Sequence, residues 1–120
     1  MVISVSPMKV SRLAQQQPWS PGDATDNIRE IAASNFALSR TGHAKERMRD
    51  RGLTMGDLLH VLKHGFVYEE AQISTRKKCF KYCIDGATPN SEGRAVRLVV
   101  VPCADPLEIK IVTVMWKDEA

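Results

Sequence analysis

Apolar residues along the chain follow one spacing before Gly65 and a different one after it. Before Gly65 they recur every three or four residues, which is typical of helices that bury one face. Capping residues and glycines interrupt the pattern and mark the helix ends. The spacing predicts helices at residues 26–38, at residues 43–51, and between the capping Thr54 and Gly65.

After Gly65 apolar and polar residues alternate, as they do on strands with one buried face. Turn residues separate the alternating segments, and their short connections favour antiparallel pairing. The pattern predicts four strands, at residues 66–71, 77–84, 95–102 and 108–116. Helices followed by strands predict an α+β domain, with the N-terminal helices packed on one face of a four-stranded, mainly antiparallel sheet.

The first 24 residues show neither pattern. They contain the polar run QQQPWSPG at residues 15–22, whose prolines and glycine regular structure does not tolerate. Residues 1–24 are therefore predicted to form a flexible N-terminal tail or linker, with Trp19 pinned to the surface of the domain. Residues 25–120 are predicted to form a single domain.

Composition limits the class of protein. A chain of 120 residues has room for one well-buried core. Its longest apolar run, residues 98–101, is far shorter than the roughly 20 residues that cross a bilayer. The N-terminus lacks the basic segment and long apolar segment of a secretory signal. We expect a cytoplasmic protein that does not interact with membranes.

The three cysteines are expected to be reduced. Their number is odd, and their spacing matches no disulfide scaffold and no zinc pattern. Cys79 and Cys83 lie four residues apart on a predicted strand, which separates them by roughly 13 Å and prevents a bond between them. We interpret all three as small, partly buried apolar residues.

The net charge of +3 conceals two basic clusters. Residues 40–51 carry five basic and two acidic side chains, and residues 76–81 carry four basic side chains and no acidic one. The rest of the chain is therefore acidic on balance. Clustered lysine and arginine side chains are typical of surfaces that contact phosphate groups.

The predicted helix 43–51 places three candidate functional side chains on one face. His43, Arg47 and Arg51 are four residues apart, so they follow one side of the helix at the rim of the apolar stripe. In one interpretation they form a cationic site. In the other, the arginine stems cover the core and the guanidinium groups pair with acids such as Glu69 or Glu70.

The predicted strand 77–84 supplies a second candidate surface. Alternation directs Tyr82 towards the helices and places Lys77 and Lys81 on the opposite face of the sheet. Arg97 is expected on that same face, and Arg94 is able to reach either one. These four cations are candidates for sequence-independent phosphate contacts, although an ordinary solvated face has the same pattern.

Metal and cofactor motifs are missing from the sequence. His60 and His64 fall away from the apolar stripe of their helix and are interpreted as surface residues. Glu69 and Glu70 are adjacent on a predicted strand and point to opposite faces. No glycine-rich phosphate loop is present. We therefore predict no metal and no cofactor.

Residues 43–116 resemble a bacterial domain family of unknown function with the signature H-A-x-x-R-M-x-x-R-G, which reads HAKERMRDRG at residues 43–52. The resemblance continues through D-L-L-x-V-L-x-x-G at residues 57–65, Phe80-Lys81-Tyr82 and the closing strand. This family looks related to the RelE-like toxins, which are small α+β ribonucleases of toxin–antitoxin modules. The resemblance implies a RelE-like fold and cleavage of RNA without a metal.

The resemblance also implies roles for individual residues. His43 would be the acid or base, Arg47 and Arg51 would stabilise the phosphorane, and Tyr82 occupies a position of the family motif. RNA would be bound by Lys77, Lys81, Arg94 and Arg97. The expected partners are RNA and an antitoxin protein.

One feature departs from the toxins. Ribosome-dependent RelE-like toxins carry basic or aromatic catalytic residues near the C-terminus, whereas this chain ends in WKDEA. The departure favours either cleavage of free RNA or a module that keeps the fold and binds nucleic acid or protein without catalysis.

Overall fold

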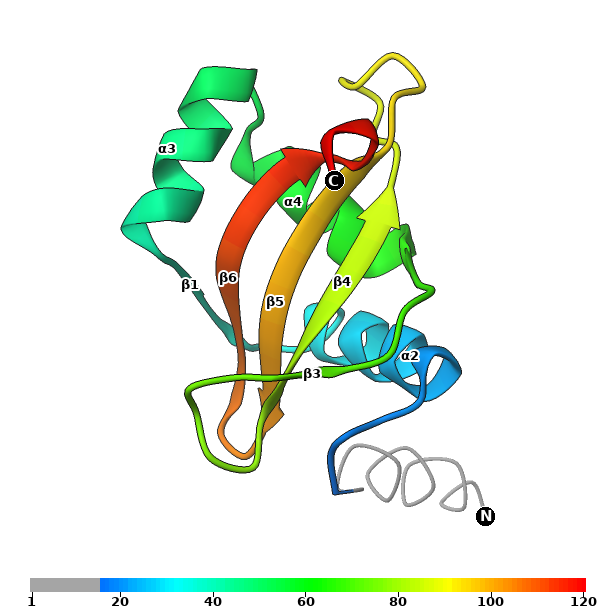
Figure 1. Cartoon of the computed structure of the whole chain (residues 1–120), viewed down its shortest axis with the longest axis vertical. Helices are drawn as coiled ribbons and strands as arrows, with labels where there is room; N and C mark the ends of the chain where they lie inside the picture. Colours follow the sequence, from blue (N-terminus) through cyan, green and yellow to red (C-terminus); the bar gives the residue numbers. More distant parts are fainter. Residues whose placement is uncertain (1–15) are drawn as a thin grey trace.

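A computed structural model describes residues 16–120 as an α+β arrangement of helices on a mixed sheet. Within these residues the sheet has six strands in the order β1-β6-β5-β4-β2, and β3 pairs with β4. Helices α2 and α4 cover one face, and α3 lies beside the edge formed by β6 and β1 (Figure 1). The helices are α2 (Pro21–Ala32), α3 (Gly42–Arg51), α4 (Met55–His64) and the 3-10 helix η2 (Lys117–Glu119). The strands are β1 (Ala37–Arg40), β2 (Phe66–Val67), β3 (Gln72–Ile73), β4 (Phe80–Gly86), β5 (Val96–Ala104) and β6 (Leu107–Trp116).

The α+β class and the mainly antiparallel sheet agree with the prediction, but the number of strands does not. β1 pairs with β6 in parallel, while the other neighbouring strands pair antiparallel. The sequence placed residues 37 and 38 at the end of a helix, whereas Leu38 lies opposite Ile109 in the sheet. Pairing with a strand about 70 residues away leaves no local signal, so helical spacing alone gave the wrong element here.

Helix α2 begins and ends earlier than predicted. Its first residue is Pro21, and the Ser20 hydroxyl caps it by accepting the backbone N–H of Asp23 at 3.2 Å. Proline is well suited to the first position of a helix because the amide hydrogen that it lacks would have no helical partner. The proline and serine that suggested a linker in the sequence therefore start the helix.

The predicted tail at residues 1–24 is only partly within the described chain, because residues 1–15 lie outside it. Residues 16–24 belong to the fold. Trp19 is buried and stacks on Tyr82 with ring centroids 5.7 Å apart, and its backbone N–H donates to the Tyr82 hydroxyl at 2.9 Å. Trp19 is thus part of the core and does not merely rest on the surface.

The core lies between the sheet and the two covering helices. Branched side chains of α2 and α4 pack against the central strands, and each fully buried one contributes roughly 1.5–3 kcal/mol relative to exposure. The main contributors are Ile28, Ile31, Leu58, Val61, Leu62, Ile84, Leu98, Val100, Ile109 and Ile111. The opposite face, here called the open face, is not covered by α2 or α4 (Figure 1).

A β-bulge in β6 fixes the start of α3. Val99 pairs with Thr113 and Val100 with Ile111, so Val112 is an extra residue in the ladder. The Thr41 hydroxyl donates to the Val112 carbonyl at 2.7 Å and accepts the Ala44 N–H at 3.0 Å. One side chain therefore caps the helix and satisfies the bulge, which holds α3 against β6.

The structure contains a disulfide between Cys79 and Cys103, so the prediction that all three cysteines are reduced is wrong for this pair. The Cα atoms are 6.1 Å apart, within the range that a disulfide requires. β5 continues to Ala104 and the loop before β4 folds over the open face, which brings the two residues together. The sequence argument had considered strand spacing only. Cys83 keeps its thiol, whose pKa is raised by burial.

We expect the Cys79→Ser/Cys103→Ser double variant to lose about 3 kcal/mol of unfolding free energy, because the bond closes a loop across 24 positions of the chain. Urea unfolding of the oxidised protein and the double variant measures the difference. Cys83→Ser is the matched control and should unfold like the parent. Equal midpoints for the parent and the double variant would show that the bond does not form in solution.

Candidate functional site

A surface cavity of about 250 Å³ lies between α3 and β6. Its walls include the three α3 side chains that the sequence singled out together with side chains from the end of β6 and from η2. We call it the α3 cavity. It is lined by His43, Arg47, Arg51, Thr113, Val114, Met115 and Glu119.

The basic side chains of the α3 cavity come from one face of α3. His43, Arg47 and Arg51 are one turn apart, while Ala44 and Met48 on the neighbouring face are buried. The C-terminal Gly52 adopts a left-handed conformation with φ of 66°, which ends the helix directly after Arg51. All three polar side chains therefore lie beside the C-terminal half of β6.

Hydrogen bonds hold the α3 side chains in different ways. Arg47 Nε donates to His43 Nε2 at 3.3 Å, a long contact that leaves the outer guanidinium nitrogens of Arg47 available. Arg51 forms a bidentate pair, in which its Nε and Nη2 donate to the two Glu119 oxygens at 2.9 and 2.7 Å. His43 and Arg47 are thus the adaptable members of the cluster.

The Arg51–Glu119 pair changes the titration of both groups. The hydrogen bond from Arg51, with a further one from the Trp116 N–H, lowers the pKa of Glu119 to about 2. The same bond raises the pKa of Arg51. Glu119 is therefore ionised at neutral pH and unsuited to donating a proton. This outcome matches the expectation that an arginine of this face pairs with an acid, although the acid is neither Glu69 nor Glu70.

A second cavity, of about 290 Å³, lies on the open face and contains Lys81. Val101 pairs with Lys110, and Lys81 precedes the Tyr82 that pairs with Val100, so the two lysines flank Val101 from neighbouring strands. We call this the lysine cavity. It is lined by Thr41, Ile73, Ser74, Thr75, Lys81, Val101, Lys110 and Val112.

Two of the predicted RNA-binding arginines are committed to acidic partners. Arg97 donates to both Asp85 oxygens at 2.8 and 3.0 Å and to Glu69 at 3.0 Å, and these contacts raise its pKa. Arg94 donates to both oxygens of Asp118 at 3.0 and 2.8 Å. Neither arginine lines the α3 cavity or the lysine cavity.

Lys77 and Tyr82 also lie outside both cavities. Lys77 is exposed on the loop before β4. Tyr82 is only 1% exposed on the helix side of the sheet, as its strand parity predicted. Its hydroxyl accepts from Trp19 and lies 3.3 Å from Gln17 Oε1, and burial raises its pKa to about 12. This position gives Tyr82 a role in the core.

Lys110 and Glu119 are the two charged residues of these cavities that the sequence reasoning missed. Alternation through Glu108, Ile109 and Lys110 is a signal for the position of Lys110 on the open face. No comparable signal exists for Glu119, because η2 turns it back towards α3 after the sheet ends.

The fold and the cavities define a small α+β domain that presents one histidine and two arginines of a single helix beside a sheet face. Among residues 16–120, no helix is long and apolar enough to cross a membrane, and no group of three His, Cys, Asp or Glu side chains is placed to hold a metal.

The chain belongs to the DUF4258 family, a domain of unknown function, whose model matches residues 41–116 and therefore more than half of the chain. Comparisons with curated proteins and with solved structures find no significant match. The family match runs from the Thr41 cap to the end of β6, so it contains the whole lysine cavity and all of the α3 cavity except Glu119.

Proposed function

We propose that this protein is a RelE-like toxin of a toxin–antitoxin module, a cytoplasmic endoribonuclease that cleaves RNA without a metal. The observation that carries the proposal is the gathering of His43, Arg47 and Arg51 in one cavity beside the open face. The motif of residues 43–52 that resembles the toxin-related family supplies all three side chains. A histidine next to a guanidinium is the minimum equipment for phosphodiester cleavage through the ribose 2′-hydroxyl.

In the proposed reaction the 2′-oxygen attacks the adjacent phosphorus and the bond from phosphorus to the 5′-oxygen breaks. His43 Nε2 accepts the 2′-hydroxyl proton after substrate displaces its long contact with Arg47. Water protonates the departing 5′-oxygen, and the resulting hydroxide takes the proton back from His43. The products are a 2′,3′-cyclic phosphate and a 5′-hydroxyl.

Arg47 is the proposed stabiliser of the pentacoordinate phosphorane. Its outer nitrogens are available, and a guanidinium donates two parallel hydrogen bonds to phosphate oxygens. Arg51 was expected to share this role, but Glu119 occupies its Nε and Nη2 donors. In the proposal Arg51, whose charge Glu119 neutralises, therefore fixes the wall of the α3 cavity.

We expect His43→Ala and Arg47→Ala each to lower the rate of RNA cleavage by at least about 100-fold, which is the typical effect of losing a general base or a charge-stabilising donor. Purified full-length protein and a labelled single-stranded RNA provide the assay. Arg49→Ala, on the exposed side of the same helix, is the matched control and should keep the parent rate. If both cavity variants cleave as fast as the control, the site assignment is wrong.

A non-catalytic binding module of the same fold is the second candidate function. It is favoured by the ion pairs that already occupy Arg51, Arg94 and Arg97, because a cleavage site gains most from cations that face the substrate. This function predicts RNA binding that weakens steeply with salt and leaves the RNA intact. Salt-insensitive or absent RNA binding would point to a protein partner.

The proposed protein partner is an antitoxin encoded beside the toxin. Expression of the chain in bacteria should slow growth, and co-expression of a small neighbouring open reading frame should restore it. Equal growth of cells that express the parent and His43→Ala would contradict a toxic activity at this site.

A further inference from the structure

The lysine cavity contains two basic side chains, Lys81 and Lys110. None of its lining residues is an acid. Within residues 16–120, Lys81 and Lys110 make no ion pair, whereas Arg76, Arg94 and Arg97 are all bound to carboxylates. Two lysines that flank an apolar floor without a counter-charge favour an anionic ligand.

The lysine cavity has room for a phosphate group with part of its ribose. Its volume of about 290 Å³ lies at the lower end of small-ligand sites. Val101 and Val112 supply apolar surface between the lysines, and Thr75 supplies an exposed hydroxyl at the rim. Ile73, with 83% of its surface exposed, adds an apolar side chain on which a ribose or base is able to pack.

Residues 72–79, here called the crossing segment, form one wall of the lysine cavity. The segment begins as β3, passes in front of the sheet and returns to start β4 (Figure 1). Ile73, Ser74 and Thr75 line the cavity from this segment, and the two lysines line it from the sheet. The cavity therefore exists only while the crossing segment stays over the open face.

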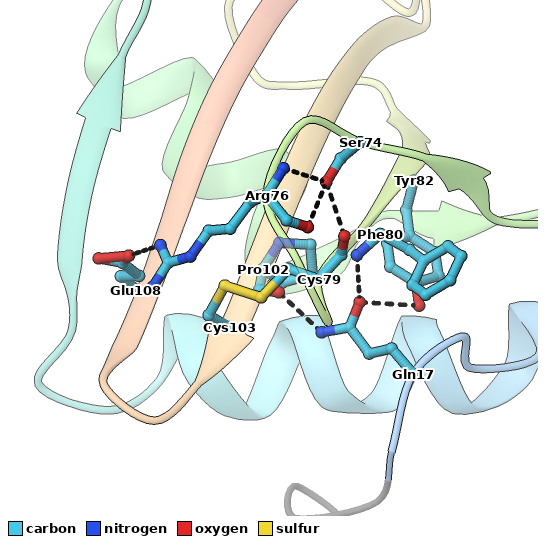
Figure 2. The surroundings of a disulfide bond; sticks show 9 residues. All are labelled: Gln17, Ser74, Arg76, Cys79, Phe80, Tyr82, Pro102, Cys103 and Glu108. Atoms are coloured by element: carbon cyan, nitrogen blue, oxygen red, sulfur yellow. Dashed lines mark hydrogen bonds and ion pairs between the residues drawn. A yellow bond between two sulfur atoms is a disulfide. The ribbon is translucent and has the colours of Figure 1, made fainter.

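One disulfide and one ion pair connect the crossing segment to the sheet (Figure 2). Cys79 is bonded to Cys103 of β5, and Arg76 forms an ion pair with Glu108 of β6. The Ser74 hydroxyl stiffens the turn by contacting the Arg76 and Cys79 carbonyls at 3.1 and 2.6 Å. The exposed ion pair is worth little by itself, so the disulfide is the stronger tie.

The lysine cavity also lies next to the α3 cavity. Val112 lines the first and Thr113 the second, and Thr41 precedes His43 by two positions. A single strand of RNA that enters the α3 cavity is therefore able to place a neighbouring phosphate between the lysines. A rigid duplex does not adapt its phosphate positions to two cavities in this way.

We propose that the lysine cavity is a phosphodiester subsite for single-stranded RNA, and that the Cys79–Cys103 disulfide sets its affinity by holding the crossing segment. The choice of RNA as the ligand rests on the proposed function. Reduction by a dithiol, which is itself oxidised to a disulfide, adds two electrons and two protons and gives two thiols that release the segment. In a reducing cytoplasm this makes RNA affinity depend on the redox state.

Fluorescence anisotropy with a labelled single-stranded RNA tests the subsite on the oxidised full-length chain. The His43→Ala background is used so that cleavage does not affect the reading. We expect Lys81→Gln/Lys110→Gln to weaken binding at least tenfold and to reduce the slope of log affinity against log salt by about 1.4, which is two single-strand phosphate contacts. The exposed pair Lys45→Gln/Lys63→Gln is the matched control and should change neither quantity by as much.

Three results would overturn the subsite: no binding of the RNA, equal affinity of the two double variants, or equal affinity for duplex RNA. Inorganic phosphate at millimolar concentration should compete weakly. Full competition at that concentration would instead identify a site for free phosphate. The cleavage assay with Arg47→Ala judges the proposed function separately, because that residue lies outside the lysine cavity.

The same anisotropy assay measures the effect of the disulfide on RNA affinity. We expect Cys79→Ser/Cys103→Ser, or reduction of the parent, to weaken RNA binding several-fold while the lysines remain in place. Cys83→Ser keeps the Cys79–Cys103 bond and is the matched control: it should bind RNA like the oxidised parent and lose the same affinity on reduction. If the affinity is unchanged on reduction, with loss of the bond verified by thiol titration, the disulfide does not set the RNA affinity of the lysine cavity.

Discussion

Asp57→Ala is expected to lower the unfolding free energy by about 4 kcal/mol, because it removes a buried carboxylate that accepts several hydrogen bonds. Asp57 is only 4% exposed. Its Oδ2 accepts from the Thr54 backbone N–H at 2.8 Å and from the Thr54 hydroxyl at 3.1 Å. The Asp57 N–H in turn donates to the Thr54 hydroxyl at 3.2 Å, which completes the capping box at the start of α4. Alanine would leave these donors without a partner inside the protein.

The same carboxylate connects α4 to the loop between β4 and β5. The Thr88 hydroxyl donates to Asp57 Oδ1 at 2.8 Å, and the Asn90 amide donates to Oδ2 at 3.2 Å. Thr88 is itself buried, so its hydroxyl cannot turn to water when Asp57 is lost. The substitution therefore loosens a helix start and a distant loop together, which is why the expected loss exceeds that of an ordinary cap.

The charge of Asp57 makes part of this stability depend on pH. Burial alone raises its pKa, but the hydrogen bonds from Thr54, Thr88 and Asn90 outweigh burial and bring the pKa below its ordinary value of 3.8. A lowered folded-state pKa adds stability that is complete above the unfolded pKa and is lost as pH falls through the folded value. The stabilisation should therefore persist at neutral pH and fade below about pH 4.

Urea unfolding of the parent and Asp57→Asn at pH 7 and pH 3 measures this contribution. The gap in unfolding free energy between them should be wide at pH 7 and narrower at pH 3, because the stabilisation by the carboxylate is lost as pH falls below its unfolded pKa. Asp50→Asn, on the exposed side of α3, is the control and should stay close to the parent at pH 7. An equal gap at both pH values would show that shape, and not charge, carries the effect.

Local signals in the sequence identified the parts of the fold that local chemistry determines. The capping Thr54 predicted the start of α4, and the glycine after residue 51 marked the end of α3. Alternation on β4 predicted that Tyr82 faces the helices. By contrast, β1 and the Cys79–Cys103 bond depend on residues far apart in the chain, and a spacing pattern holds no information about such pairing.

In the candidate sites, too, local spacing predicted some features and long-range contacts determined the others. Four-residue spacing placed His43, Arg47 and Arg51 on one helix face, and the structure brings all three into the α3 cavity. The partners of the charges were not predictable from spacing. Glu119 reaches Arg51 only because η2 turns back after β6, and Asp85 of β4 lies directly opposite Arg97 of β5. Counting clustered cations therefore did not reveal that Arg51 and Arg76 pair with acids.

Gly65→Ala is expected to lower the unfolding free energy by about 4 kcal/mol, because there is no room for a β-carbon at this position. A Cβ there would lie 2.6 Å from the Val61 carbonyl oxygen and 2.7 Å from the Asp85 carbonyl oxygen. Both are backbone atoms, one of α4 and one of β4, so relief requires the helix and the sheet to separate.

A side chain of α2 also binds the C-terminal end of α4 at Gly65. Arg29 of α2 donates to the Gly65 carbonyl at 3.1 and 2.8 Å and to the His64 carbonyl at 2.9 Å, so a shift of this residue disturbs three elements at once. Thermal and urea unfolding of Gly65→Ala measure the loss. Gly56→Ala, on the same helix, is the matched control, because its nearest new contact would be an ordinary 3.5 Å and alanine favours helix formation. It should leave stability unchanged or raise it slightly, and an equally stable Gly65→Ala would mean that α4 and β4 pack less closely than this structure requires.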